Sequence, residues 1–262
     1  MLEAAPALER LSLNGSHYPP LGAEALRSVS GVMRNGVLQN LEEVVLRRCT
    51  LGDGDIKGFA DALNEFGCAK RLGQLTFISC GVGVEGVRLL ADLLSRGVFP
   101  ALECLNLPGN PNISDVGVVA LAEALMKSMQ NFLTILDLEN VGMGKEGISA
   151  VASLVGQGRL EHLKTLNISE NEDLTEQGII TLARAIGVRG LPMLETFAMV
   201  KIGNMTAREI GAIAHGVFKG CPQVKEIHLT ESDFASDDSS EVVDGMVEAA
   251  GLAGKVKVVY GK

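Results

Sequence analysis

The stretch LECLNLPGN, residues 102–110, decides the fold of this 262-residue chain. Its apolar residues follow the pattern L-x-x-L-x-L-x-x-N. Leu105 and Leu107 alternate around Asn106, and this period of two predicts a half-buried β-strand. A short strand cannot bury its apolar face alone, so the motif calls for similar units beside it.

The same pattern recurs along the chain at a nearly constant spacing. Successive copies begin 33, 31, 30, 31, 30, 31 and 30 residues apart. A fixed period of this length is typical of a solenoid, in which each repeat packs against its two neighbours. The first residues of the eight copies are Leu8, Leu41, Leu72, Leu102, Leu133, Leu163, Leu194 and Val224.

A helical segment follows each strand motif. In ISDVGVVALAEAL, residues 113–125, Val118, Leu121 and Leu125 recur at helical spacing and share one face. We expect Ser114 to cap the amino end of this helix. A glycine near the start of each helix would allow either close approach of helix and strand or an unusual backbone angle. These glycines are Gly86, Gly117, Gly147 and Gly178.

The ninth motif position alternates between polar and apolar residues in the later repeats. An inward asparagine or cysteine at this position can satisfy backbone groups of the adjacent loop, whereas valine and isoleucine cannot. The alternation matches the alternating steps of 31 and 30 residues. From the second repeat to the seventh, the ninth residues are Cys49, Cys80, Asn110, Val141, Asn171 and Ile202.

Together, the strand motif and the GVVALAEAL-like helices resemble the ribonuclease-inhibitor type of leucine-rich repeat. This family includes ribonuclease inhibitor, the Ran GTPase-activating protein and the repeat domains of NOD-like receptors. The resemblance covers about residues 8–250. It implies that a partner protein binds on the concave face of the solenoid or on its rim.

We therefore predict an α/β leucine-rich-repeat horseshoe of about eight repeats, with a parallel sheet on the concave side and helices on the convex side. The unbroken register predicts a single domain over residues 1–262. Residues 8–40 form an irregular first repeat, in which Tyr18-Pro19-Pro20 predicts a loop. Residues 41–223 form regular repeats. Residues 224–262 are expected to form a polar terminal repeat and a closing strand.

Charge and cysteine content restrict the partner and the compartment. The net charge of −9 disfavours nucleic acid, which requires a basic stripe, and mildly favours a basic protein partner. No apolar run is long enough to span a membrane, and the first residues do not resemble a secretory signal. Five cysteines without a C-x-x-C pair predict free thiols. We therefore expect a cytoplasmic protein that has no membrane partner.

The sequence offers no convincing catalytic or cofactor motif. Residues 81–86 and 142–147 match the dinucleotide-binding pattern G-x-G-x-x-G, but both occupy the loop that leads into the helix of a repeat. The four histidines form no metal-binding pattern with one another or with cysteine. No nucleophile and base can be paired. We expect no enzymatic activity, no cofactor, no metal and no small-molecule substrate.

Side chains between the paired leucines should face the concave side, where a partner would bind. Asp137, Glu139 and Glu170 form an acidic patch, and Arg47 and Arg48 form a basic one. Apolar residues at the same positions, rimmed by charge, are typical of an interface; they are Val45, Ile78, Ala198 and Val200. The candidate partner-binding residues are Arg47, Arg48, Thr76, Asn106, Asp137, Glu139, Asn167, Glu170, Lys201 and His228.

The leading functional hypothesis is a protein-binding scaffold that forms the regulatory segment of a larger signalling protein. It follows from the repeat count and from the absence of a catalytic constellation. The resemblance implies an alternative, a GTPase-activating protein similar to the Ran GTPase activator. The sequence specifies neither the identity of the partner nor the oligomeric state.

Overall fold

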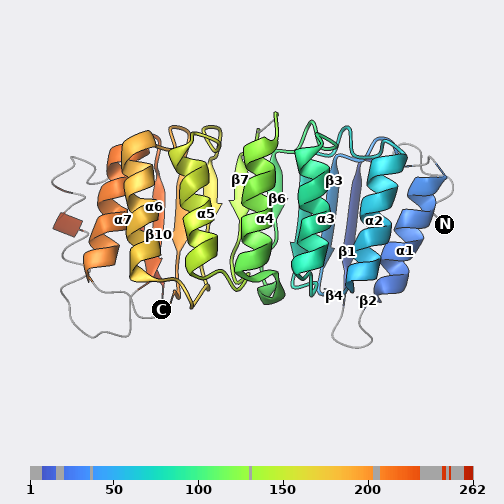
Figure 1. The fold of residues 1–262 in the computed structure, drawn as a ribbon, viewed down its shortest axis with the longest axis horizontal. Helices are drawn as coiled ribbons and strands as arrows, with labels where there is room; N and C mark the ends of the chain where they lie inside the picture. The colour runs from blue at the N-terminus through green and yellow to red at the C-terminus, as the bar shows by residue number, and fades with distance from the viewer. Residues whose placement is uncertain are drawn as a thin grey trace.

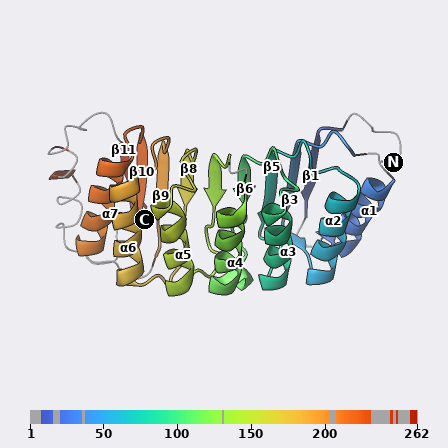
Figure 2. The same cartoon turned by 45° about the horizontal axis from the view of Figure 1, so that its top comes forward.

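The fold is a single row of strand–helix units that stack side by side. The computed structural model describes residues 8–15, 21–35, 38–129, 132–202, 207–230, 244, 245, 248 and 257–261. Nine parallel strands form one open sheet in the order β1-β3-β5-β6-β7-β8-β9-β10-β11. Helices α1 to α7 form a second layer over one face of this sheet (Figure 1). Both layers bend so that the helices lie on the outer, convex side (Figure 2).

The strands of the main sheet are short and follow the motif spacing. They are β1 (Arg10–Asn14), β3 (Glu43–Arg47), β5 (Gln74–Ile78), β6 (Cys104–Asn106), β7 (Ile135–Asp137), β8 (Thr165–Asn167), β9 (Thr196–Met199), β10 (Glu226–Thr230) and β11 (Lys257–Gly261). A second small sheet pairs β2 (Leu21–Gly22) with β4 (Cys49–Thr50). The predicted closing strand is therefore present as β11, which pairs in parallel with β10.

One helix follows each strand of the regular repeats. The helices are α1 (Ala23–Arg34), α2 (Asp53–Glu65), α3 (Val84–Ser95), α4 (Ser114–Lys127), α5 (Lys145–Gly156), α6 (Glu176–Arg189) and α7 (Ala207–Gly220). A 3₁₀ turn, Pro111–Ile113, precedes α4. The predicted leucine-rich-repeat architecture is confirmed. The expected loop at residues 18–20 and the expected terminal helix over residues 234–250 fall on residues that are wholly or largely outside the described ranges.

The core lies between the two layers and consists of repeating aliphatic rows. Parallel pairing places Leu105 between Leu75 and Leu136, and the row continues through every repeat. On the helix side, Val118, Leu121 and Leu125 are buried, as their spacing predicts. The few aromatic residues reinforce the core locally: the rings of Phe59 and Phe77 meet edge to face at 6.2 Å.

Buried asparagines fix the loops that join strand to helix. Asn171 is 1% exposed, and its Nδ2 donates to the carbonyls of Leu138, Ile168 and Ser169. Its Oδ1 accepts from the backbone N–H groups of Val141 and Met143, in the preceding repeat. Asn110 makes the equivalent bonds two repeats earlier. Its Oδ1 accepts from the backbone N–H groups of Cys80 and Val82, and its Nδ2 donates to backbone carbonyls. The predicted role of the ninth position is confirmed, because one side chain satisfies groups of two repeats.

Cysteines take the same position in the earlier repeats. Cys80 Sγ lies 3.3 Å from the carbonyl oxygens of Leu46 and Ile78. All five cysteines are free and buried. Burial raises the pKa of Cys80 and of Cys221 to about 12, so these thiols stay protonated and unreactive at neutral pH.

The start of α5 is tied to the neighbouring repeat, whereas Thr175 caps α6 locally by accepting from Gly178 N. Ser114 was expected to cap α4, but it is the first residue of that helix, and the N-cap position is Ile113, which has no side-chain oxygen to accept a hydrogen bond. Instead, Asp115 Oδ1 accepts from the backbone N–H groups of Gly144 and Gly147, both at 2.7 Å, at the start of α5. A carboxylate on one helix therefore caps the next, where the positive end of the helix dipole favours it.

Two kinds of glycine keep adjacent repeats close. A Cβ on Gly178 would lie 2.3 Å from Ile148 Cγ2, so close approach explains this glycine, although the neighbour is the preceding helix and not a strand. Gly142 differs, because its φ is +70° and a Cβ there would lie 2.3 Å from Pro111 O. Within the described residues, no helix combines the length and apolar composition that a bilayer crossing requires.

Asn171→Ala should lower the free energy of unfolding by about 3 kcal/mol, because buried donors and acceptors in two loops lose their partner. Urea unfolding followed by circular dichroism measures the change. The matched control is Asn112→Ala, an exposed asparagine, which should change stability by less than about 0.5 kcal/mol. Equal effects of the two variants would contradict the role assigned to Asn171.

Gly142→Ala should destabilise the chain by at least about 2 kcal/mol, because alanine must adopt a left-handed φ and displace the Pro111 carbonyl. Gly58→Ala is the control: Gly58 lies inside α2 with open space around it, and alanine there should stabilise by about 0.5–1 kcal/mol. Thermal unfolding of both variants measures whether Gly142→Ala loses stability and Gly58→Ala gains it. A Gly142→Ala protein as stable as wild type would refute the role assigned to Gly142.

Candidate protein-binding surface

The concave face carries rows of side chains that the parallel register aligns across repeats. One row passes through Asn106, Asp137 and Asn167, which lie opposite one another on β6, β7 and β8. It continues to Ala198 on β9 and His228 on β10. Adjacent strands are about 4.8 Å apart, so residues distant in sequence become direct neighbours on this face.

A shallow cavity of about 430 Å³ lies over β7 to β10 on this face. Six of the ten candidate residues line it, and they come from four different repeats. Threonines, small residues and Val200 complete the wall. The six candidate residues are Asp137, Glu139, Asn167, Glu170, Lys201 and His228.

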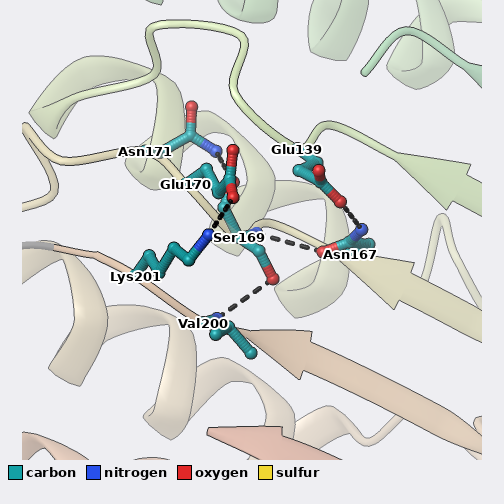
Figure 3. A network of polar contacts seen from close by, with 7 residues as sticks. All are labelled: Glu139, Asn167, Ser169, Glu170, Asn171, Val200 and Lys201. Atoms are coloured by element: carbon teal, nitrogen blue, oxygen red, sulfur yellow. Dashed lines mark hydrogen bonds and ion pairs between the residues drawn. The ribbon is translucent and has the colours of Figure 1, made fainter. Parts of the chain in front are cut away.

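A hydrogen-bond network orders one side of the cavity (Figure 3). Asn167 Nδ2 donates to Glu139 Oε2 at 2.9 Å, and its Oδ1 accepts from the backbone N–H of Ser169 at 3.1 Å. Ser169 Oγ accepts from the backbone N–H of Val200 at 3.0 Å. The bond from Asn167 bridges two repeats and holds one oxygen of the Glu139 carboxylate in place.

Glu170 and Lys201 form the rim of the cavity. Lys201 Nζ lies 2.8 Å from Glu170 Oε1, and this contact raises the pKa of the Lys201 ammonium. Both residues adopt left-handed backbone angles, φ 57° and 53°, in the turn that follows each strand. Arg48 occupies the equivalent turn position with φ 51°. These three candidate residues therefore belong to the rim, whereas Asp137 and Asn167 belong to the strands.

Asp137 lies deepest among the carboxylates of the cavity. Its Oδ1 accepts from the backbone N–H of Glu139 at 3.0 Å. Burial raises the pKa of Asp137, and the nearby Glu139 carboxylate adds to this effect. Three carboxylates thus share the cavity with one ammonium, Lys201, which pairs with Glu170 and also interacts electrostatically with Glu139. The excess of carboxylates gives the cavity local negative charge that favours a cation.

His228 lies at the opposite end of the cavity. Its Nε2 is 3.3 Å from Glu226 Oε2, and its side chain is partly exposed. His228 and Lys257 together lower the pKa of the Glu226 carboxyl. The histidine is therefore paired on its own strand, and it borders the cavity without contacting the acidic pair.

The other candidate residues do not join this cavity. Arg47 and Arg48 are exposed at the end of β3, three strands or about 14 Å from the acidic pair. Thr76 is 2% exposed, and its hydroxyl oxygen accepts hydrogen bonds from Gln74 and Asn106. Thr76 therefore offers almost no surface to a partner. Val45, expected to be exposed, is 3% exposed.

Asn106 has an unusual environment beside the cavity. Its Nδ2 contacts Thr76 Oγ1 and Cys104 Sγ, on the side away from Asp137. Its Oδ1 is buried and accepts no hydrogen bond from the residues that the structure describes. An acceptor oxygen without a donor is costly, so Asn106 lowers the stability of the fold at this point, and its Oδ1 is closed to solvent.

Sequence reasoning missed three cavity residues, Thr165, Thr196 and Ser169. Thr165 and Thr196 each lie two residues before a predicted concave residue, so the same strand alternation could have found them. Ser169 lies two residues after Asn167, so the same alternation reaches it as well. In the parts of the chain that the structure describes, no group of three His, Cys, Asp or Glu residues could hold a metal ion.

Comparison with known proteins agrees with this geometry. The sequence profile of the family described as "Leucine Rich repeat" matches residues 100–122 and 159–183. These segments begin just before the strand motifs of the fourth and sixth repeats and extend into their helices. They are the two repeats that carry the buried asparagines Asn110 and Asn171.

The curated relatives found are each 29% identical in sequence to this chain over the matched residues. A Tonsoku-like protein from Bos taurus is 29% identical over 188 residues, which cover 71% of this chain and 13% of that protein. Leucine-rich repeat-containing protein 73 from Homo sapiens and Rattus norvegicus is 29% identical over 170 residues, 64% of this chain and 50% of each relative. The chain thus spans at most half the length of these relatives.

A solved structure was also found in the comparison. A chain in the crystal structure of the yeast Rad7 and Elc1 complex is 14% identical in sequence, with a TM-score of 0.48. The match covers 97% of this chain and 68% of that chain.

The raised pKa of Asp137 gives a pH test of the site. In the window between the ordinary and the raised value, the folded protein binds more protons than the unfolded chain. The free energy of unfolding therefore falls as pH rises through that window. Asp137→Asn removes this loss, so the variant should gain stability relative to wild type as the pH rises from about 4, the ordinary aspartate value, toward neutrality. Urea unfolding across this range, with Asp92→Asn on α3 as the control, measures it. Parallel pH profiles of wild type and Asp137→Asn would contradict the assignment.

Proposed function

We propose that this chain is a protein-binding module whose concave cavity receives a basic segment of a partner protein. The observation that carries the proposal is the pair of half-buried carboxylates, Asp137 and Glu139, on one wall of the cavity. An arginine or lysine side chain would neutralise this pair and lower the cost of keeping Asp137 ionised.

The chemistry of a basic side chain fits this wall. An ammonium or guanidinium group brings positive charge together with several N–H donors, and the carboxylate oxygens of Asp137 and Glu139 are acceptors. Neutral or acidic side chains lack this combination of charge and multiple donors. The wall residues that are held by hydrogen bonds would need little reordering, which reduces the entropic cost of binding.

We propose that residues 1–262 act as one non-catalytic domain of the ribonuclease-inhibitor type, which the continuous sheet and the helices α1 to α7 of the described residues support. Five free, buried cysteines support a reducing compartment such as the cytoplasm. We also propose that the chain is the regulatory segment of a larger signalling protein; the Tonsoku-like relative, in which the match spans 13% of the length, supports the part of this proposal that concerns a larger protein.

GTPase activation is the alternative, and no contact among the described residues favours it over binding alone. The two functions differ in one measurement. Adding the protein to a panel of small GTPases would accelerate GTP hydrolysis if it were an activator. No acceleration across the panel excludes the alternative.

Asp137→Lys/Glu139→Lys should weaken binding of a labelled lysine–serine peptide by at least about tenfold, because attraction becomes repulsion at the cavity wall. Fluorescence anisotropy measures the Kd, and a glutamate–serine peptide serves as the charge control. The matched variant is Glu85→Lys/Asp92→Lys on α3, which changes the net charge equally on the convex side.

The control variant should weaken peptide binding by less than about twofold. Circular dichroism establishes that both variants fold. If both pairs of substitutions weaken binding equally, the effect is one of total charge, and the cavity is not the site. If wild type shows no preference for the basic peptide over the acidic one, the proposal is wrong.

A further inference from the structure

A second recess lies on the convex side, where α6 and α7 pack against each other. It has a volume of about 370 Å³, and we call it the α6–α7 groove. Its floor consists of small and aliphatic residues, Ile180, Ala183 and Ala212. At one end lies Val188, which is 84% exposed and has no apolar cover. The groove belongs to the helix layer, away from the concave cavity (Figure 1).

Glycines bring the two helices unusually close. A Cβ on Gly216 would lie 2.3 Å from Ala183 O, and one on Gly187 would lie 3.5 Å from Gly216 Cα. Because backbones touch directly, the side chains that flank the contact stand as ridges on either side. The result is a narrow recess with an apolar base and exposed walls, the shape into which a helix packs.

The walls of the groove are basic, although the whole chain carries a net charge of −9. Arg184 stands on the α6 side, and His215 and Lys219 stand on the α7 side. Within the described residues, these three side chains have no hydrogen bond or ion pair. Arg208 also lines the groove, and it is paired with Glu176 at 2.8 Å.

On α2, α3 and α4, basic residues pair with a carboxylate of the same helix. On α2, Lys57 pairs with Asp61; on α3, Arg88 pairs with Glu85. Lys127 at the end of α4 lies 3.9 Å from Glu123. Each of these cations has a carboxylate within one turn on its own helix. Arg34 on α1 and Lys145 on α5 have no such partner among the described residues, so the α6–α7 groove is distinguished by having two unpaired cations, Arg184 and Lys219, beside one recess. These two give the groove positive charge that an anionic ligand would complement.

We propose that the α6–α7 groove binds an acidic amphipathic helix of a partner protein. Apolar side chains of that helix would cover Val188 and the exposed part of Ala212, and flanking Asp or Glu side chains would pair with Arg184 and Lys219. The apolar floor distinguishes this ligand from a phosphate polyanion, which needs cations but no apolar contact. Glu176 at the groove also disfavours a continuous row of phosphates. Both helices have 14 residues, about 21 Å, which matches a helical segment of four turns.

A labelled 14-residue helical peptide, the length of α6 and α7, tests the proposal. It carries leucines along one face and glutamates beside them, and its partner probe has lysine in place of glutamate. Wild type should bind the acidic peptide and not the basic one. Arg184→Glu/Lys219→Glu should raise the Kd for the acidic peptide by at least about tenfold. Val188→Glu, at an exposed position, should also weaken binding.

Two controls make the outcome decisive. Lys57→Glu/Arg88→Glu changes the same total charge on α2 and α3 and should alter the Kd by less than about twofold. Asp137→Lys/Glu139→Lys on the concave face should not weaken binding of the acidic peptide, which separates this proposal from the function proposed above. Equal weakening by both convex pairs would overturn it. Groove-dependent binding of duplex DNA or of phosphatidylserine vesicles, without binding of the peptide, would also overturn it.

Discussion

Parallel pairing of each strand with the equivalent strand of the next repeat is the interaction on which the rest of this structure depends. The register is kept from β1 to β11, so residues at the same motif position become lateral neighbours. Apolar rows then fill the space between the layers, and polar rows line the concave face. A shift of one residue in any pair would send a leucine row to the solvent side.

The buried asparagines hold this register at the loops. Asn110 and Asn171 each satisfy backbone groups of their own repeat and of the preceding one. Asp115 links two repeats in a similar way at the helix starts. Such side chains act between units and not within them, which explains why neighbouring repeats must fold together.

The concave cavity and the α6–α7 groove differ in local charge. On the concave face, strands stand about 4.8 Å apart, so Asp137, Glu139 and their neighbours are crowded and partly buried. On the convex face, helices are wider, and Lys57, Arg88 and Lys127 each pair with a carboxylate on their own helix. The α6–α7 contact differs because its glycines draw the helices together and place unpaired cations around an apolar floor.

The sequence by itself determined the repeat architecture, the alternation of strand and helix and the role of the ninth motif position. All of these follow from local periodicity, which a single chain displays completely. It also identified the residues of the concave face, including Asp137, Glu139 and Asn167. Only the tertiary structure decided which of them meet in one cavity, that Thr76 is buried under its neighbours, and that Asp115 on α4 caps the start of α5. Those outcomes depend on distances between side chains of different repeats, and spacing along the chain carries no information about them.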